Sequence, residues 1–302
     1  MTSNSVPRSP SYVLNWLYNR FLELIIYPSI WVALAIASLG IYASQTFGLE
    51  TDWQPILLIF FTALIPYNLD RIFDSYIQTI PDERAQLFFR KPYVLILLLL
   101  AIAGTAWLLY TAPLQVKYVS IAGIVPLLYG APVLPFKREQ WQWYRLKDIP
   151  GSKAWIVGSV LTYAVVAIPL AYAGRGIHLS ELLITLFLFV FIVTNSHIFD
   201  LRDIESDRQK GVVTLPIMVG VKSTKLVLTI MNLAIALVIF ITWNNNAIAY
   251  HPEIILAAIV NLLYVALVDT DAPRWVYSIV IEGCLFAPLL FGLVFGSTAF
   301  IE

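Results

Sequence analysis

Long stretches without a charged side chain constrain this chain more than any other feature. A transmembrane helix needs roughly 20 apolar residues. Eight charge-free stretches recur along the sequence: Leu24–Leu49, Trp53–Leu69, Pro92–Val116, Tyr118–Phe136, Ala154–Gly174, Leu182–Phe199, Leu226–Pro252 and Ile254–Val268. A ninth apolar stretch covers about Trp275–Gly296 and contains one charge, Glu282. The pattern therefore predicts nine transmembrane helices.

The composition excludes the common soluble classes. Hydrophobic residues make up 59% of the 302 residues and charged residues only 13%, whereas a soluble domain has roughly 45–50% and about 25%. So few charges cannot cover the surface of an ordinary soluble enzyme, a disordered protein or a nucleic-acid-binding module. The single cysteine, Cys284, excludes an internal disulfide framework and a cysteine-based zinc site. An all-α polytopic membrane protein remains.

The distribution of basic residues predicts the orientation of the spans. With nine spans, 17 of the 19 Lys and Arg residues fall on the N-terminal side, and only Lys117 and Arg175 fall on the other. Basic loops stay in the cytoplasm. We therefore expect the N-terminus and the long loops to be cytoplasmic and the C-terminus to lie on the opposite side. Residues 1–20 would form a cytoplasmic arm, with a short amphipathic helix around Tyr12–Tyr18.

Two pairs of aspartates follow directly from the second and sixth spans. The first pair is Asp70 and Asp74, and the second is Asp203 and Asp207, with Asp200 one turn earlier. On a helix, residues i and i+4 share one face. Two carboxylates about 6 Å apart repel each other by roughly 3 kcal/mol at an effective dielectric constant of 20. Because Mg²⁺ typically bridges carboxylates to substrate phosphates, the two pairs predict a magnesium-held diphosphate.

The four-span offset between the pairs predicts an internal duplication. The repeat halves would cover about 21–136 and 154–268, with a ninth helix after them, and residues 21–302 would form one transmembrane domain. Repeats with an even number of spans keep the same orientation and face each other about an axis along the membrane normal. Both aspartate pairs would then lie at the cytoplasmic mouth of one central cavity.

Other interpretations of the aspartates start from the same residues. A single Asp-x-x-x-Asp is commonly a solvated helix face, but two copies at equivalent positions favour a functional site. A transporter would also combine repeats with membrane carboxylates. Its carboxylates would lie near the midplane of the bilayer, whereas these follow the ends of spans.

Several motifs together resemble the UbiA-type superfamily of intramembrane prenyltransferases. In chain order they are Asp70-Arg71-x-x-Asp74, Tyr129-Gly-Ala-Pro132, Ile149-Pro-Gly-Ser-Lys153, Asp203-x-x-x-Asp207-x-x-x-Gly211, Thr214-Leu-Pro216 and Gly220. The first motif departs from the family pattern. Pro66 and Tyr67 stand where family members usually carry Asn and often Asp, and the nearest asparagine is Asn68.

The resemblance implies Mg²⁺-dependent transfer of a prenyl chain from an allylic diphosphate to an aromatic or quinone-precursor acceptor. The partners it implies are an isoprenyl diphosphate, that hydrophobic acceptor and the bilayer, with no nucleic acid. The expected catalytic and metal-binding residues are Asp70, Asp74, Asp203 and Asp207, with Asp200 as a further metal ligand. The expected substrate-binding residues are Asn68, Arg71, Tyr129, Lys153, Asn195, Arg208 and Lys210.

Two alternatives stay within the same superfamily. An intramembrane terpene cyclase would ionise the same kind of diphosphate but needs no acceptor. An inactive lipid-binding relative would retain diphosphate binding without releasing the chain. The altered first motif is the sequence feature that motivates both alternatives.

Overall fold

The structure of the protein is a computed structural model that describes residues 10–77, 87–89, 91–124, 132–137, 141–145, 149–246, 248–249 and 251–295. The α-helices are α1 (Pro10–Phe21), α2 (Ile30–Thr46), α3 (Trp53–Ile77), α5 (Pro92–Thr111), α6 (Leu114–Ser120), α8 (Lys153–Tyr172), α9 (Leu179–Arg202), α10 (Ile204–Gln209), α11 (Leu215–Val219), α12 (Val221–Asn244), α13 (Pro252–Leu267), α14 (Glu282–Cys284) and α15 (Ala287–Phe295). Two π-helices, η1 (Leu22–Ile26) and η4 (Val276–Ile281), and a short 3₁₀ helix, η2 (Ile121–Gly123), also lie among the described residues.

The expected helical membrane architecture is confirmed. In the described part of the chain, α5, α8, α9, α12 and the run Val276–Phe295 are long and apolar enough to cross a membrane. The pair Tyr12–Ile26 and Ile30–Thr46 forms a further candidate span, bent by 60°. Trp53–Leu69 and Pro252–Leu267 are shorter apolar helices. These helices follow the order of eight of the nine expected spans, so the chain is a multi-pass integral membrane protein.

The expected fourth span differs from a continuous helix. It begins as α6 and η2, and residues 125–131 lie outside the described residues. Its last residues belong instead to strand β1 (Pro132–Lys137), which pairs antiparallel with β2 (Trp141–Arg145). The prolines at positions 132 and 135 favour this short two-stranded sheet over a helix because proline cannot donate a helical hydrogen bond. The count of nine therefore stays a prediction.

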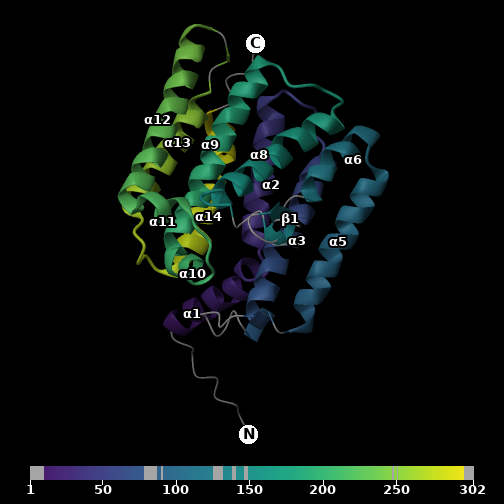
Figure 1. The fold of residues 1–302 in the computed structure, drawn as a ribbon. Helices are drawn as coiled ribbons and strands as arrows, with labels where there is room; N and C mark the ends of the chain where they lie inside the picture. The colour runs from purple at the N-terminus through teal and green to yellow at the C-terminus, as the bar shows by residue number, and fades with distance from the viewer. Residues whose placement is uncertain are drawn as a thin grey trace.

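The helices pack in a layered arrangement around α2, α8 and α9. Figure 1 shows α12 and α13 along one edge of the molecule and α5 and α6 along the other, with α1, α10 and α11 at one end. Close packing of α8 against α9 depends on Gly158, because a Cβ there would collide with the side chain of Val193. Small residues allow membrane helices to approach in this way. The leucines of α5, such as Leu99 and Leu100, remain exposed on the outside, where lipid would cover them.

The predicted N-terminal helix is present as α1, and a bend joins it to the first span. Ser29 adopts a left-handed conformation with φ 60°, and the turn leaves backbone carbonyl groups without helical partners. Two side chains of α3 supply donors to them. Arg71 Nη1 donates to the carbonyls of Ile26 (3.0 Å) and Tyr27 (3.2 Å), and Asn68 Nδ2 donates to that of Pro28 (3.0 Å). Because lipid offers no hydrogen bonds, these contacts stabilise the bend.

A chain of polar side chains connects three helices inside the membrane region. Asn232 of α12 donates to Thr194 Oγ1 of α9 at 2.8 Å. Asn261 of α13 donates to Asn232 Oδ1 at 2.9 Å. Such interhelical hydrogen bonds contribute about 0.6–2 kcal/mol each in membranes, so the chain helps to hold α9, α12 and α13 together behind the aspartate motifs.

Candidate functional site

The first aspartate motif lies on one continuous helix. Helix α3 does not end at Leu69, where the apolar stretch stops, but continues to Ile77. Asp70 and Asp74 are therefore one turn apart in the same helix, as the spacing predicts. Their backbones are described, whereas their side chains lie outside the described part of the structure.

The second motif surrounds a break between two helices. Helix α9 ends at Arg202, and Asp203 links it to α10 with φ −94° and ψ 7°. The Asp207 N–H donates to the Asp203 carbonyl at 2.7 Å, so the helical i,i+4 spacing survives the break. Asp200 lies in the last turn of α9. Gly211 then ends α10 with φ +70°, a conformation that glycine adopts without steric cost.

Lys153 bridges two carboxylates of the second motif. It is the first residue of α8, and its Nζ donates to Asp207 Oδ2 at 2.8 Å and Oδ1 at 3.1 Å. The same Nζ lies 3.3 Å from Asp200 Oδ1. Both carboxylates are almost completely buried. The Gly151 N–H donates to the Val213 carbonyl at 2.6 Å, which ties the start of α8 to the segment after α10 and so positions the lysine.

Arg202 binds the remaining carboxylate. Its Nε and Nη2 donate to the two oxygens of Asp203 at 2.7 and 2.9 Å, the bidentate geometry that guanidinium groups form with carboxylates. The guanidinium also lies over the rings of Phe199 (4.8 Å) and Tyr277 (5.6 Å). Tyr277 is fully buried and donates to the Asp269 carbonyl at 2.8 Å. The last span therefore helps to hold Arg202 against the motif.

The pKa values of Asp203 and Asp207 move in opposite directions. Burial disfavours the charged form of Asp203, but the hydrogen bonds and charge of Arg202, with Lys153 and Lys210 nearby, lower its pKa overall. Burial raises the pKa of Asp207, the contact with Lys153 opposes this, and the charges of Asp200 and Asp203 raise it further. An added cation would therefore favour the charged form of Asp207 against both burial and the neighbouring carboxylates.

The donor set of the second motif fits a hard divalent cation. Asp200 Oδ2 is buried and has no hydrogen-bond partner in the described structure. Nδ1 of the buried His197 lies 3.6 Å from it, beyond hydrogen-bond range. Mg²⁺ prefers carboxylate oxygens, and the Lys153 ammonium already places positive charge between two of them. Among the described side chains, no three Asp, Glu, His or Cys residues converge as a ready metal site, and those of Asp70 and Asp74 are not in that set.

Glu282 lies beside the arginine of the first motif. Arg71 Nη2 of the first motif is 3.9 Å from Glu282 Oε1, and Glu282 is buried near the start of the last apolar run. It lies in the electrostatic field of both Arg71 and Arg202. Asn195, another expected substrate-binding residue, donates instead to the carbonyl of Ile281 at 2.8 Å. The structure thus brings residues of α3, α9 and the last span together.

Of the remaining expected substrate-binding residues, two lie on the surface and one lies outside the described residues. Arg208 and Lys210 are exposed at the end of α10. Tyr129 lies outside the described residues. No role was assigned to Arg202 from the sequence alone. Its position between Asp200 and Asp203 is the only sequence feature that could have indicated one. The sequence could not show that this arginine rather than Arg71 would donate to an aspartate of the second motif.

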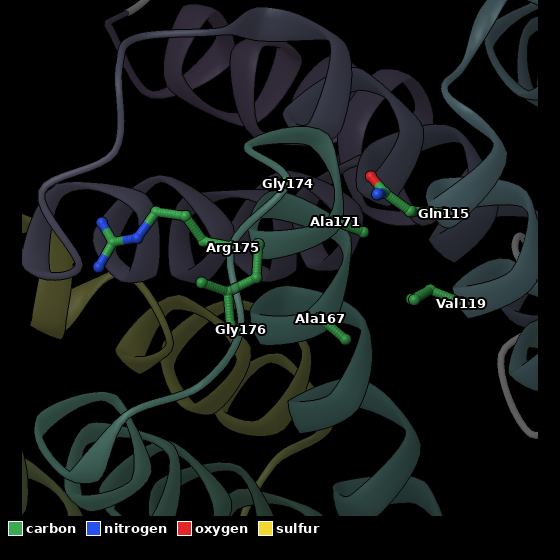
Figure 2. Close-up of a pocket in the computed structure, with 8 residues that line it drawn as sticks. Gln115, Val119, Ala167, Ala171, Gly174, Arg175 and Gly176 are labelled. Carbon is green, nitrogen blue, oxygen red and sulfur yellow. The ribbon is translucent and has the colours of Figure 1, made fainter.

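A separate pocket lies at the other end of α8 from Lys153. It has a volume of about 380 Å³ and is lined by Gln115, Val119, Ala167, Leu170, Ala171, Gly174, Arg175 and Gly176. Figure 2 shows Gln115 and Val119 facing Ala167 and Ala171 across it. Arg175 donates to the Phe47 carbonyl at 2.8 Å and to Glu181 at 2.9 Å. Since α8 rises about 1.5 Å per residue, this pocket is remote from the aspartate motifs.

Comparisons with known proteins agree with this architecture. A UbiA homologue from Archaeoglobus fulgidus bound to GPP and Mg²⁺ shares 14% identity, with 91% of this chain and 99% of that chain covered and a TM-score of 0.56. An apo UbiA homologue from Aeropyrum pernix K1 shares 15% identity, with 89% and 98% covered and a TM-score of 0.59. A structure of digeranylgeranylglyceryl phosphate synthase shares 17% identity, with 92% and 98% covered and a TM-score of 0.53.

These structural likenesses show the fold, and the sequence shows the family. A comparison with curated proteins finds no match. A profile of the UbiA prenyltransferase family, however, matches residues 87–279, which is more than half of the chain and includes Lys153 and the whole second motif. The chain therefore belongs to the UbiA prenyltransferase family.

Proposed function

We propose that the protein transfers a prenyl chain from an allylic isoprenyl diphosphate to a hydrophobic acceptor, aromatic or quinone-precursor in kind, within the membrane. The observation that carries this proposal is that Lys153 bridges Asp200 and Asp207 while Arg202 pairs with Asp203, around the break between α9 and α10. Family membership supports the reaction class. The GPP, DMAPP and Mg²⁺ found with the Archaeoglobus homologue support the substrate class and the metal.

Each motif has a defined part in this reaction. Asp70, Asp74, Asp200, Asp203 and Asp207 would hold Mg²⁺, which stabilises the diphosphate leaving group as a Lewis acid. Lys153 is placed to donate charge-assisted hydrogen bonds to diphosphate oxygens. The apolar helices would surround the prenyl tail and keep water away from the cation formed when the C–O bond breaks.

We further propose that both motifs face the cytoplasm, in one domain built from two repeats. The distribution of basic residues supports this orientation, since α1 and α10, which contain Arg20 and Arg208, lie toward the same end of the molecule (Figure 1). Arg175, one of the two basic residues assigned to the opposite side, lies at the far end of α8. Cysteine labelling of Gly48→Cys and Ser206→Cys variants in sealed vesicles tests it, because the two sites should react from opposite sides.

Release of pyrophosphate tests the reaction. The purified protein in detergent is incubated with Mg²⁺ and allylic diphosphates of increasing length, with and without a mixture of aromatic acceptors. Release that requires an acceptor supports the transferase and shows its donor length. Acceptor-independent release with a cyclic product would instead identify a terpene cyclase, one of the two alternatives that the altered first motif motivates. Binding without release would identify an inactive relative.

A further inference from the structure

Two basic side chains of the protein itself pair with the three carboxylates of the second aspartate motif and leave one negative charge uncompensated. Lys153 contacts Asp200 and Asp207, and Arg202 contacts both oxygens of Asp203. Each of the three carboxylates is thus paired before any ligand arrives. A metal ion that binds Asp203 through its carboxylate oxygens must compete with Arg202 for them.

Arg202 is held firmly yet remains accessible. The rings of Phe199 and Tyr277 lie under its guanidinium, and cation–π contacts of this kind contribute about 0.5–2 kcal/mol. The side chains of Arg202 and Asp203 are 31% and 29% exposed, in contrast to the buried carboxylates of Asp200 and Asp207. The Arg202–Asp203 pair is therefore partly open to solvent, from which an anion can approach it.

A guanidinium binds a carboxylate and a phosphate through the same pair of parallel hydrogen bonds. Once a metal ion takes the oxygens of Asp203, the donors of Arg202 are released beside the metal. We propose that Arg202 exchanges partners: it is the counter-ion of Asp203 in the empty site and a diphosphate ligand in the filled site. This inference rests on the proposed function, and it adds a residue to the substrate-binding set.

The arginine of the first motif is placed differently. Arg71 Nη1 donates to the carbonyls of Ile26 and Tyr27 in the bend before α2. Nη2 of the same side chain is directed to the buried Glu282. Transfer of Arg71 to a diphosphate would leave those carbonyls without these donors in an apolar environment, whereas transfer of Arg202 leaves Asp203 with a metal ion as its partner.

Calorimetric titration of inorganic pyrophosphate with Mg²⁺, and of Mg²⁺ alone, tests the proposal on the full-length protein in detergent. The variants are Arg202→Gln, Arg202→Lys and, as a matched control, Arg274→Gln, which changes an exposed arginine just before η4. We expect Arg202→Gln to weaken magnesium pyrophosphate binding about tenfold or more, the loss expected for charge-assisted hydrogen bonds. Arg202→Lys should lose less, and the control should stay within about twofold of the wild type, since exposed charges contribute little.

The titration with Mg²⁺ alone separates exchange from a merely structural role. If Arg202 competes with the metal, Arg202→Gln binds Mg²⁺ at least as tightly as the wild type. A variant that loses Mg²⁺ and pyrophosphate together, with a lower melting temperature, would show that Arg202 only maintains the fold. Unchanged pyrophosphate affinity in Arg202→Gln overturns the proposal whatever the Mg²⁺ result. If the wild type itself binds no magnesium pyrophosphate, the proposed function fails as well.

Discussion

Replacing Lys153 by methionine tests the electrostatic design of the second motif. The change keeps a long apolar stem at the start of α8 but removes the ammonium that lies 2.8 Å from Asp207 and 3.3 Å from Asp200. Both carboxylate side chains are at most 6% exposed. Removing one partner of a buried ion pair costs about 3–5 kcal/mol. Because Lys153 itself is 26% exposed, solvent reduces the expected loss to about 2–3 kcal/mol.

The assay is thermal unfolding in detergent, with and without Mg²⁺. A loss of this size lowers the melting temperature by roughly 4–12 °C if each kcal/mol corresponds to about 2–4 °C. Magnesium should restore much of this loss in Lys153→Met, because the ion replaces the missing charge and stabilises the folded state by binding to it. The wild type, in which the Lys153 ammonium already contacts both carboxylates, should gain less from Mg²⁺.

A control and a double variant make the result specific. Lys225→Met removes a cation whose partner, Asp269, is 75% exposed, and exposed pairs contribute at most about 1 kcal/mol. Replacing Asp207 by Asn in the Lys153→Met background should recover stability, because one unpaired buried charge is then removed. If Lys153→Met melts like the wild type in Mg²⁺-free buffer, the ammonium does not neutralise the motif and the reasoning is refuted.

Three further predictions concern packing, the polar network and the metal-binding residues. Gly158→Ala should destabilise the protein by about 1–3 kcal/mol, because the added Cβ would collide with a valine of α9. The control variant Gly123→Ala, which has open space around its Cβ position, should change the melting temperature little. Equal shifts in melting temperature for the two variants would contradict the close α8–α9 contact. Asn232→Leu should cost about 0.6–2 kcal/mol in thermal unfolding, and no loss would show that its hydrogen bonds contribute nothing. The Asp70→Ala and Asp203→Ala proteins should still insert into membranes but should no longer release pyrophosphate in the presence of Mg²⁺. Normal release by both variants would exclude these aspartates as metal ligands.

The sequence alone determined the architecture because membrane insertion depends on local composition. A run of about 20 apolar residues must form a helix in lipid, where each backbone group needs an internal partner. The order of the spans, the amphipathic helix at the N-terminus and the positions of both aspartate pairs at span ends could therefore be predicted. The expected fourth span was the exception, because its last residues form strand β1.

The tertiary structure decided which charges meet. Lys153 and Asp207 lie far apart in the chain, and only the tertiary packing of the start of α8 beside α10 brings their charged groups to 2.8 Å. Arg71 and Arg202 each lie next to an aspartate in the sequence. The bend before α2 and the rings beside α9 nevertheless give their guanidinium groups different partners. Spacing along one helix fixes which side chains share a face, whereas the partners of a long cationic side chain depend on which carbonyl, carboxylate and aromatic groups neighbouring helices bring within its reach.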